Sequence, residues 1–501
     1  MKKSTYFGLL ATFSLISFNQ TVCSSEVTSA FGPYQTTGFK IGEVTESRAL
    51  IWTRLTQSPQ RVGSDSSMPV FLYKNPDTGE LIEGPDSLVP TVGSWESVFE
   101  YLDGATIKTI EGAVPGTPGQ VRVRFRPIDA VNWRTTEWHA VDTDKDFTRQ
   151  IELRDLSPAT RYEMVVDGRS SDKNTVSSSL DGRFKTAPKA SDPSRVVFAL
   201  SSCQEYPHQD AIGGGFKIYP SILELDPDFF VNTGDIVYYD RSAKNLELAR
   251  WVWARMFSLP TNHMFHRQVS SYFMKDDHDT WMNDAWPSRD VKFMGDFTFA
   301  QGLSTFLEQV PIDSPTYRTF RWGKDVQIWM VEGRDYRSAN SAPDGPEKSV
   351  WGPEQLAWFK ETVQKSDATF RILISPTPLV GPDRRNKFDS HANEGFQFEG
   401  EILREFIARQ DNMIVITGDR HWQYISVDDA TEVREYSTGA SSDEHAGGWA
   451  RDDLRPEHRY LNVVGGFLSV TAERINGISS LTMRHHGVEG NILNEDVIRA
   501  E

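Results

Sequence analysis

Residues 229–240 read FFVNTGDIVYYD, an apolar run that ends in Gly234-Asp235. Much later in the chain, Met413–Ile416 forms a similar apolar run and leads into TGDRHWQY at residues 417–424. In an open α/β sheet, ligands bind at the carboxyl ends of the parallel strands. The two Gly-Asp pairs therefore predict that two distant parts of the chain deliver carboxylates to the same sheet edge.

Two further apolar runs end in residues that can bind metals. Val196–Leu200 leads into SSCQ at 201–204, and Tyr272–Met274 leads into KDDHD at 275–279. One such loop alone is most often a solvated turn, but carboxylates gathered from several strand ends repel one another unless cations lie between them. Because carboxylates, imidazoles and a thiol occur together, the set predicts a di- or trinuclear centre with a transition metal.

The composition excludes some classes of partner. The chain has 501 residues and a formal net charge of −17, which argues against duplex nucleic acid as a partner. Its 14 tryptophans and 29 phenylalanines supply bulky side chains for a large core. An acidic enzyme can still bind an anionic substrate where metal ions supply the local positive charge.

The first residues have the pattern of an export signal. Lys2 and Lys3 precede an apolar stretch over residues 6–18, which is shorter than a membrane span, and small residues around Cys23 offer a cleavage site. We expect a Sec-type signal peptide over 1–24 and a periplasmic or secreted protein, with an uncleaved anchor as the alternative. Lipid anchoring at Cys23 is not expected, because a valine precedes it, and no other stretch is apolar enough to span a membrane.

The rest of the chain divides into two regions. Over residues 26–187, strand-like segments alternate in polarity, and the turn LSPATRY (156–162) with the closing FKTAP (184–188) resembles a fibronectin III-like β-sandwich. Segment 58–120 is rich in Gly, Pro and acidic residues, so we expect an insertion or long loops there. Over residues 190–501, strands alternate with helices, which predicts an α/β sheet covered on both faces.

Four segments of the second region are assigned individually. Residues 352–364 and 399–409 have the periodicity of amphipathic helices, and Pro353 suits the first turn of the earlier one. Residues 467–472 and 480–484 are expected to form a closing pair of strands, with an antiparallel arrangement as one alternative.

With these motifs in place, residues 190 to about 430 resemble the alkaline phosphatase D-like (PhoD-type) branch of the calcineurin-like metallophosphoesterase superfamily. The motifs that carry the resemblance are SCQ at 202–204, GD at 234–235, DDHD at 276–279 and GDRH at 418–421, with VEGRDYR at 331–337 and WGPEQLAWF at 351–359. The resemblance implies a four-layer αββα catalytic domain that follows the all-β sandwich.

The resemblance also implies an activity and a set of site residues. It implies a metal-dependent phosphoric ester hydrolase, acting on phosphodiesters, phosphomonoesters or both, in which a metal-bound hydroxide attacks phosphorus. The metal ligands implied are Cys203, Asp235, Asp277, Asp419 and His421. The catalytic residues implied are Asp235 as the bridge between ions, His278 as proton donor to the leaving group and Arg420 at the phosphate oxygens, with His391 and Asp276 as substrate contacts or orienting groups.

The metals implied are Ca²⁺ together with a transition metal such as Fe³⁺, with Mn²⁺ or Zn²⁺ as alternatives. Members of the branch hold iron(III) with a tyrosine that precedes the third motif. Here segment 248–260 offers Trp251, Trp253 and Phe257 and no tyrosine, so Tyr238 and Tyr239 are the remaining candidates.

Other functions stay open at this stage. The same metal site could hydrolyse sulfate esters or phospholipid head groups, or the chain could be a non-catalytic, metal-stabilised protein that binds a surface polymer. A glycosidase built on a pair of carboxylates is a further alternative, and it would keep its activity after chelation. The expected partner is a small phosphate ester or a phospholipid, and the sequence leaves the oligomeric state open.

Overall fold

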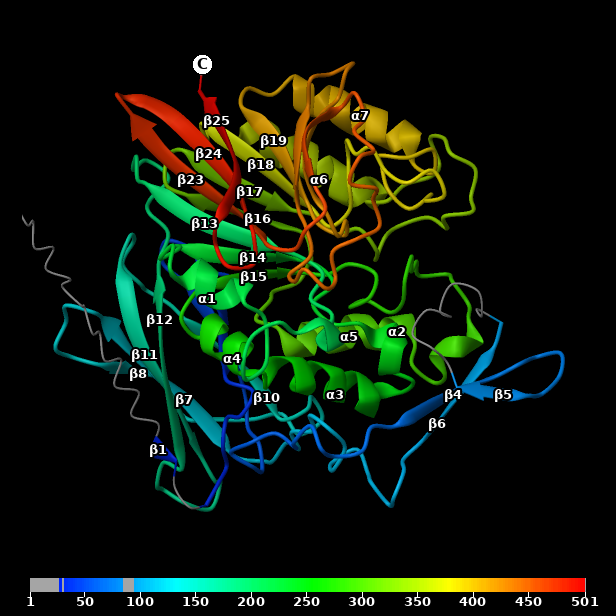
Figure 1. The fold of residues 1–501 in the computed structure, drawn as a ribbon. Helices are drawn as coiled ribbons and strands as arrows, with labels where there is room; N and C mark the ends of the chain where they lie inside the picture. Colours follow the sequence, from blue (N-terminus) through cyan, green and yellow to red (C-terminus); the bar gives the residue numbers. More distant parts are fainter. Residues whose placement is uncertain (1–26, 29–30, 84–93, 501) are drawn as a thin grey trace, which may run out of the picture.

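The computed structural model describes residues 27–28, 31–83 and 94–500 (Figure 1). The predicted signal peptide, residues 1–24, lies outside these residues, and so does Cys23. Among the helices of the described ranges, none combines the length and apolarity needed to cross a membrane.

The N-terminal region is built from antiparallel strands. Its larger sheet has the order β1 (Val27–Thr28), β12 (Ser178–Lys185), β11 (Arg161–Arg169), β7 (Gln120–Pro127) and β8 (Arg134–Thr135), with β9 (His139–Ala140) also on β7. A second sheet has the order β10 (Thr148–Leu153), β3 (Ala49–Arg54) and β2 (Phe39–Gly42). Buried and partly exposed residues alternate along β7, as a strand with one face on the core requires. The predicted N-terminal β region is therefore present.

The segment expected to be an insertion or long loops contains a small sheet. Strands β5 (Leu81–Glu83), β4 (Val70–Lys74) and β6 (Glu96–Glu100) pair antiparallel and project from the body at the lower right of Figure 1. The ring of Tyr73 stacks on Phe293 with 6.1 Å between centroids, which attaches the projection to the rest of the molecule.

Two large mixed sheets dominate the second region. The first has the order β15 (Ser271–Met274), β14 (Phe229–Thr233), β13 (Val196–Ser201), β23 (Phe467–Ile475), β24 (Ile478–His486) and β25 (Ile492–Arg499). The second has the order β16 (Arg318–Trp322), β17 (Val326–Met330), β18 (Phe370–Ser375), β19 (Met413–Thr417), β21 (Arg434–Thr438), β20 (Gln423–Val427) and β22 (His458–Asn462). The strands β13, β14 and β15 are parallel, as are β17, β18, β19 and β21, while β23 and β24 form the predicted antiparallel pair.

The helices lie between and after these strands. They are α1 (Ile218–Leu223), α2 (Tyr239–Ser242), α3 (Leu246–Phe257), α4 (Pro260–His266), α5 (Phe299–Gln309), α6 (Gly352–Lys365) and α7 (Gln397–Ala408), with short 3₁₀ turns at Tyr206–His208 and Lys292–Met294. The two helices predicted from periodicity correspond to α6 and α7.

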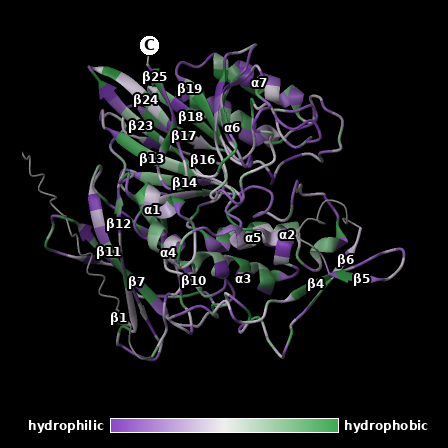
Figure 2. Cartoon of the chain, viewed as in Figure 1, coloured by the Kyte–Doolittle hydropathy of each residue, from purple (hydrophilic) through white to green (hydrophobic). Residues whose placement is uncertain are grey.

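Neighbouring residues of the buried strands face different sets of side chains. Phe198, Phe229, Ile372 and Ile416 belong to one core that contains residues of both large sheets. Residues on the opposite faces pack with helices, since Phe230 and Phe273 join a cluster with α3, and Leu373 and Val415 join a cluster with α6 and α7. In Figure 2 hydrophobic residues follow the central strands, whereas the connecting loops are largely hydrophilic. The result is a sheet-rich, mixed α/β fold in which one core contains residues of both large sheets.

Substitution of Phe229 tests the packing of this core. Its ring lies 4.5 Å from the Phe198 ring and 4.7 Å from the Trp322 ring, measured between centroids, and it is fully buried. Phe229→Ala leaves a cavity there, so we expect the free energy of unfolding to fall by about 3–5 kcal/mol, measured by urea denaturation. Phe398→Ala on α7, at a residue that is 39% exposed, is the control and should change it by clearly less than Phe229→Ala. Equal losses in the two variants would contradict this packing.

Candidate metal centre

The four loops singled out in the sequence meet in space. They follow β13, β14, β15 and β19. Ser202 forms a bridge with Ala440, its Oγ accepts a hydrogen bond from the Asp419 amide at 3.3 Å, and the Cys203 amide donates to the Gly234 carbonyl at 3.2 Å. The strand ends of both large sheets therefore converge on one place.

Glycine precedes two of the aspartates because the loops approach too closely for a side chain. A Cβ added at Gly234, where φ is +109°, would lie 2.7 Å from the Cβ of Asp276. A Cβ added at Gly418 would lie 2.6 Å from Thr233 Oγ1 and 2.8 Å from Ser202 Oγ. These separations are shorter than non-bonded atoms tolerate. The close approach of the loops therefore requires a glycine before each of the two aspartates.

The residues at three of these strand ends also adopt an unusual backbone conformation. Cys203, Asp235 and Asp419 have φ values of 54°, 54° and 59°, in the left-handed region that residues with a Cβ rarely adopt. Such conformations persist where the surroundings fix them, and they cluster at functional sites. Here the Gln204 amide donates to the Asp235 carbonyl at 3.0 Å and helps to fix two of these loops together.

All five predicted metal ligands lie in this convergence. In each of three groups the ligand atoms lie within 4.8 Å of one another: Cys203–Asp235–His421, Asp235–Asp277–His278 and Asp235–Asp276–Asp419. Asp235 belongs to every group, which is the placement that a carboxylate bridging two ions requires. Its Oδ2 lies 3.6 Å from Cys203 Sγ.

The electrostatics of these side chains fit a site for cations. Burial, and then the charge of Asp277, raises the pKa of Asp235 well above its ordinary value. Burial likewise raises the pKa of Asp419 to about 7, and it raises that of the Cys203 thiol well above its usual range. The Oδ2 atom of Asp276 is buried and has no hydrogen-bond partner among the described residues. Multivalent cations would relieve the repulsion and occupy that oxygen.

Arg334 compensates part of this charge, and sequence reasoning gave it no role. It is fully buried, its Nε donates to Asp276 Oδ1 at 2.5 Å, and its Nη2 lies 3.6 Å from Asp277 Oδ2. Burial alone would raise the pKa of Asp277, but Arg334 and His278 lower it below its ordinary value, so Asp277 is ionised. The only sequence signal was the VEGRDYR stretch that contains this arginine.

The ring of His278 is held by two neighbouring side chains. Its Nδ1 lies 2.9 Å from Asp240 Oδ1, and its ring stacks on Tyr238 with 4.2 Å between centroids. Burial would lower the pKa of His278, but the carboxylates of Asp240, Asp277 and Asp235 outweigh it and raise the pKa well above its ordinary value. The bond to Asp240 uses Nδ1 and leaves Nε2 for another partner. Asp240 was not identified from the sequence, where it is only the last residue of YYD.

Arg420, predicted to contact phosphate oxygens, pairs with acids of the chain. Its side chain is fully buried, and the guanidinium donates to the carboxylates of Asp383, Asp419 and Asp389, the last at 3.3 Å. Its Nε has no hydrogen-bond partner among the described residues. A contact between Arg420 and phosphate therefore stays a prediction.

The two predicted substrate contacts are also placed differently. The Nε2 atom of His391 lies 2.8 Å from Glu399 Oε2 on α7, its ring meets Trp351 edge-on, and the side chain is buried, so its contacts are structural. Asp276 is buried against Arg334 and grouped with Asp235, which favours metal binding over contact with substrate.

The two candidate tyrosines differ in position. The hydroxyl of Tyr238 lies 3.0 Å from His445 Nε2, beside the His278 ring. The hydroxyl of Tyr239 accepts a hydrogen bond from Trp253 Nε1 at 2.5 Å in the core formed by α3. Only Tyr238 therefore lies at the centre.

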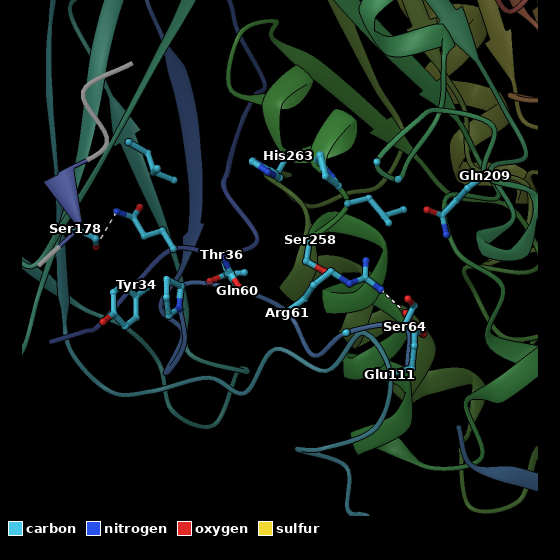
Figure 3. Close-up of a pocket in the computed structure, with 18 of the residues that line it drawn as sticks. Tyr34, Thr36, Gln60, Arg61, Ser64, Glu111, Ser178, Gln209, Ser258 and His263 are labelled. Atoms are coloured by element: carbon cyan, nitrogen blue, oxygen red, sulfur yellow. Dashed lines mark hydrogen bonds and ion pairs between the residues drawn. The ribbon is translucent and has the colours of Figure 1, made fainter. Parts of the chain in front are cut away.

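A separate pocket lies away from the candidate metal ligands. It has a volume of about 640 Å³ and is lined by residues that include Arg61, Glu111, Gln209 and His263, with Tyr34 and Ser178 on the side of the N-terminal strands (Figure 3). None of the candidate metal ligands lines it.

The buried acids predict how the metal-free protein responds to pH. Burial raises the pKa of Asp419 to about 7 and that of Asp279 to about 8. At these two residues the folded chain therefore holds more protons than the unfolded chain, whose aspartates titrate near about 3.9, and their contribution to stability must fall as pH rises. Histidines such as His263 and His485, whose pKa burial lowers to about 4, contribute in the opposite direction. With a chelator present, we therefore expect the free energy of unfolding of wild type relative to Asp419→Asn, measured with urea, to decrease from about pH 5 to about pH 8.

A further comparison completes this experiment. Added Ca²⁺ or Zn²⁺ should reverse the decrease, because a bound cation favours the ionised acids. A difference between wild type and Asp419→Asn that stayed constant over this pH range would contradict the raised pKa of Asp419.

Comparisons with known proteins agree with this geometry. Residues 198–448 match the family model of the PhoD-like phosphatases, and no curated protein matches the chain. A solved structure described as that of PhoD is similar with a TM-score of 0.68 and 16% identity, over 95% of this chain and 92% of that chain. A purple acid phosphatase from yellow lupin (Lupinus luteus) seeds is similar with a TM-score of 0.61 and 12% identity, over 94% and 75% of the two chains.

At these identities the two structures show the fold, while the family model covers half of the chain and includes all four ligand-bearing loops. The resemblance inferred from the motifs is thereby confirmed: the chain belongs to the PhoD-like phosphatase family and is a phosphoric ester hydrolase.

Proposed function

We propose that this chain is a secreted or periplasmic, metal-dependent hydrolase of phosphodiesters, phosphomonoesters or both, and that the convergence around Asp235 is its active site. The observation that carries the proposal is that Asp235 lies in all three ligand groups, at a point where four strand ends meet. When bound there, the ions would supply an activated water and neutralise charge on the phosphoryl oxygens.

The ligand types suggest how different ions would be held. Cys203, with His421 and Asp235, offers sulfur, nitrogen and oxygen, which suits a transition metal such as Fe³⁺, with Mn²⁺ or Zn²⁺ as alternatives. Asp235, Asp276 and Asp419 offer only oxygen, which suits Ca²⁺. Burial and the neighbouring His445 keep the pKa of His421 well below its ordinary value, so His421 is neutral and has a lone pair to donate.

His278 is proposed to protonate the leaving oxygen. Asp240 holds the Nδ1 side of the ring, and the Tyr238 ring supports one face. The imidazolium form, which the carboxylates Asp240 and Asp277 favour, has a proton to give from Nε2. Asp240 is then a positioning residue, because it acts through His278.

We also propose the domain division inferred from the sequence: a signal peptide over 1–24, a fibronectin III-like β-sandwich over 26–187 and a four-layer αββα catalytic domain over 190–501. The antiparallel sheets of the N-terminal region support the sandwich. The shared core between the large sheets, together with the helix clusters on their other faces, supports the four layers.

Asp235→Asn tests the proposed site. Loss of the shared carboxylate should lower hydrolysis of both p-nitrophenyl phosphate and bis-p-nitrophenyl phosphate by more than about 100-fold, with a lower metal content by elemental analysis. Asp429→Asn, an exposed acid in a turn, is the matched control and should keep wild-type activity and metal. Survival of both activities in Asp235→Asn would overturn the assignment, and full activity in a chelator would exclude a metal-dependent reaction.

His278→Ala separates proton donation from metal binding. We expect the rate to fall by about 10²–10⁴-fold for an alkyl phosphate, whose leaving group needs a proton. With p-nitrophenyl phosphate, whose leaving group needs little protonation, the loss should be much smaller. Asp240→Asn should show the same substrate dependence with a smaller loss, because the ring remains. Equal losses on both substrates would remove the role of general acid from His278.

A further inference from the structure

A second group of metal-ligating atoms lies beside the proposed active site. Glu205, His208 and His445 each offer one such atom. The Nδ1 atoms of the two histidines are 2.8 Å apart, and both lie 3.0 Å from Glu205 Oε2. Two nitrogens and one oxygen thus form a nearly equilateral triangle, contributed by segments more than 200 residues apart in the chain.

This triangle is close to one face of a zinc site. In tetrahedral Zn²⁺ coordination, bonds of about 2.0–2.1 Å place the ligand atoms about 3.3 Å apart. The observed separations are shorter by only a few tenths of an ångström, so a small outward movement of the side chains would complete the face. Without a cation, the two Nδ1 atoms and the carboxylate oxygen compete for the available N–H groups.

The surrounding contacts orient the ligand atoms. The Nε2 atom of His445 lies 3.0 Å from the Tyr238 hydroxyl, so with Nδ1 on a metal its N–H would donate to that oxygen. Arg241 Nε donates to Glu205 Oε1 at 2.8 Å, which leaves Oε2 on the side of the triangle. Metal-bound histidines and carboxylates are commonly held by such outer hydrogen bonds.

The burial of the three residues leaves room for a further ligand. The side chains of Glu205 and His445 are 4% and 7% exposed, whereas that of His208 is 33% exposed. Solvent therefore reaches the group from the side of His208, where a water molecule could provide the fourth ligand of a tetrahedral ion.

We propose that Glu205, His208 and His445 form a binding site for an additional divalent cation of the zinc class, separate from the centre around Asp235. The cation would join the turn at Tyr206–His208 to the loop that carries His445, whose ring lies 4.0 Å from that of His421. It would thereby hold the loop that carries His445 against His421, a proposed metal ligand of the active site. The proposal stands on these three residues and does not depend on the reaction proposed above.

The number of bound ions tests the proposal. The purified, chelator-treated protein is dialysed against Zn²⁺ and its zinc content is measured by elemental analysis. We expect wild type to bind about one Zn²⁺ per chain more than His208→Ala. His139→Ala, which removes a partly exposed histidine on β9, is the matched control and should bind as much Zn²⁺ as wild type. Asp235→Asn should still lose one ion when His208→Ala is added. Equal zinc contents of wild type and His208→Ala would overturn the site.

A measurement on the unmodified sequence gives an independent answer. Diethyl pyrocarbonate acylates accessible, unligated imidazoles, and peptide mapping identifies the modified histidines. Zn²⁺ should protect His208 from modification while His139 continues to react. If His208 reacted equally with and without Zn²⁺, the three side chains would form only a hydrogen-bonded cluster and the proposed site would be excluded, whatever the folding of the variants.

Discussion

The repulsion among buried carboxylates is the constraint that shapes the centre of this protein. Asp235, Asp276, Asp277 and Asp419 come from three strand ends and lie within a few ångströms of one another, the first three buried and Asp419 nearly so. In the absence of compensation, the least costly response is to keep protons on them, and burial raises the pKa values of Asp235 and Asp419 in that direction. A site held in that condition has a strong preference for multivalent cations.

The fold creates this repulsion by bringing backbone loops unusually close. Parallel strands place their carboxyl ends at one edge, but only glycine at 234 and 418 lets the loops approach to the observed distance. The left-handed conformations of Cys203, Asp235 and Asp419 then follow from chains that must turn sharply after each strand. Family membership agrees with the outcome, because the matched region spans all of these loops.

The parts of the site that could be predicted are those tied to strand ends. Apolar runs that end in Gly-Asp, Cys or Asp-His residues indicate strand ends, so the sequence predicted that the loops carrying the five candidate ligands and His278 would meet. Arg420 and His391 were identified as candidates, but a sequence does not show which of several carboxylates a cation or imidazole contacts, and both turned out to be occupied by internal acids. Arg334 was missed for the same reason, since its partners are distant in the chain. The predicted helices α6 and α7 have polar residues on one face, and α6 also has Pro353 in its first turn, whereas α3 is buried on most sides.

The arginines bind some of the carboxylate oxygens at the centre and leave others for cations. Arg334 takes Oδ1 of Asp276, while Oδ2 of that residue is buried without a partner among the described residues. Arg420 binds Oδ2 of Asp419 and is itself held by Asp383 and Asp389. A buried arginine paired in this way cannot leave its acid without exposing an uncompensated charge, which would cost about 3–5 kcal/mol. The oxygens that the arginines bind are therefore fixed by the protein. The other oxygens of the same carboxylates then keep a constant orientation whether or not an ion is bound. This arrangement explains how one fold can hold closely spaced acids ready for metal without collapse of the loops that carry them.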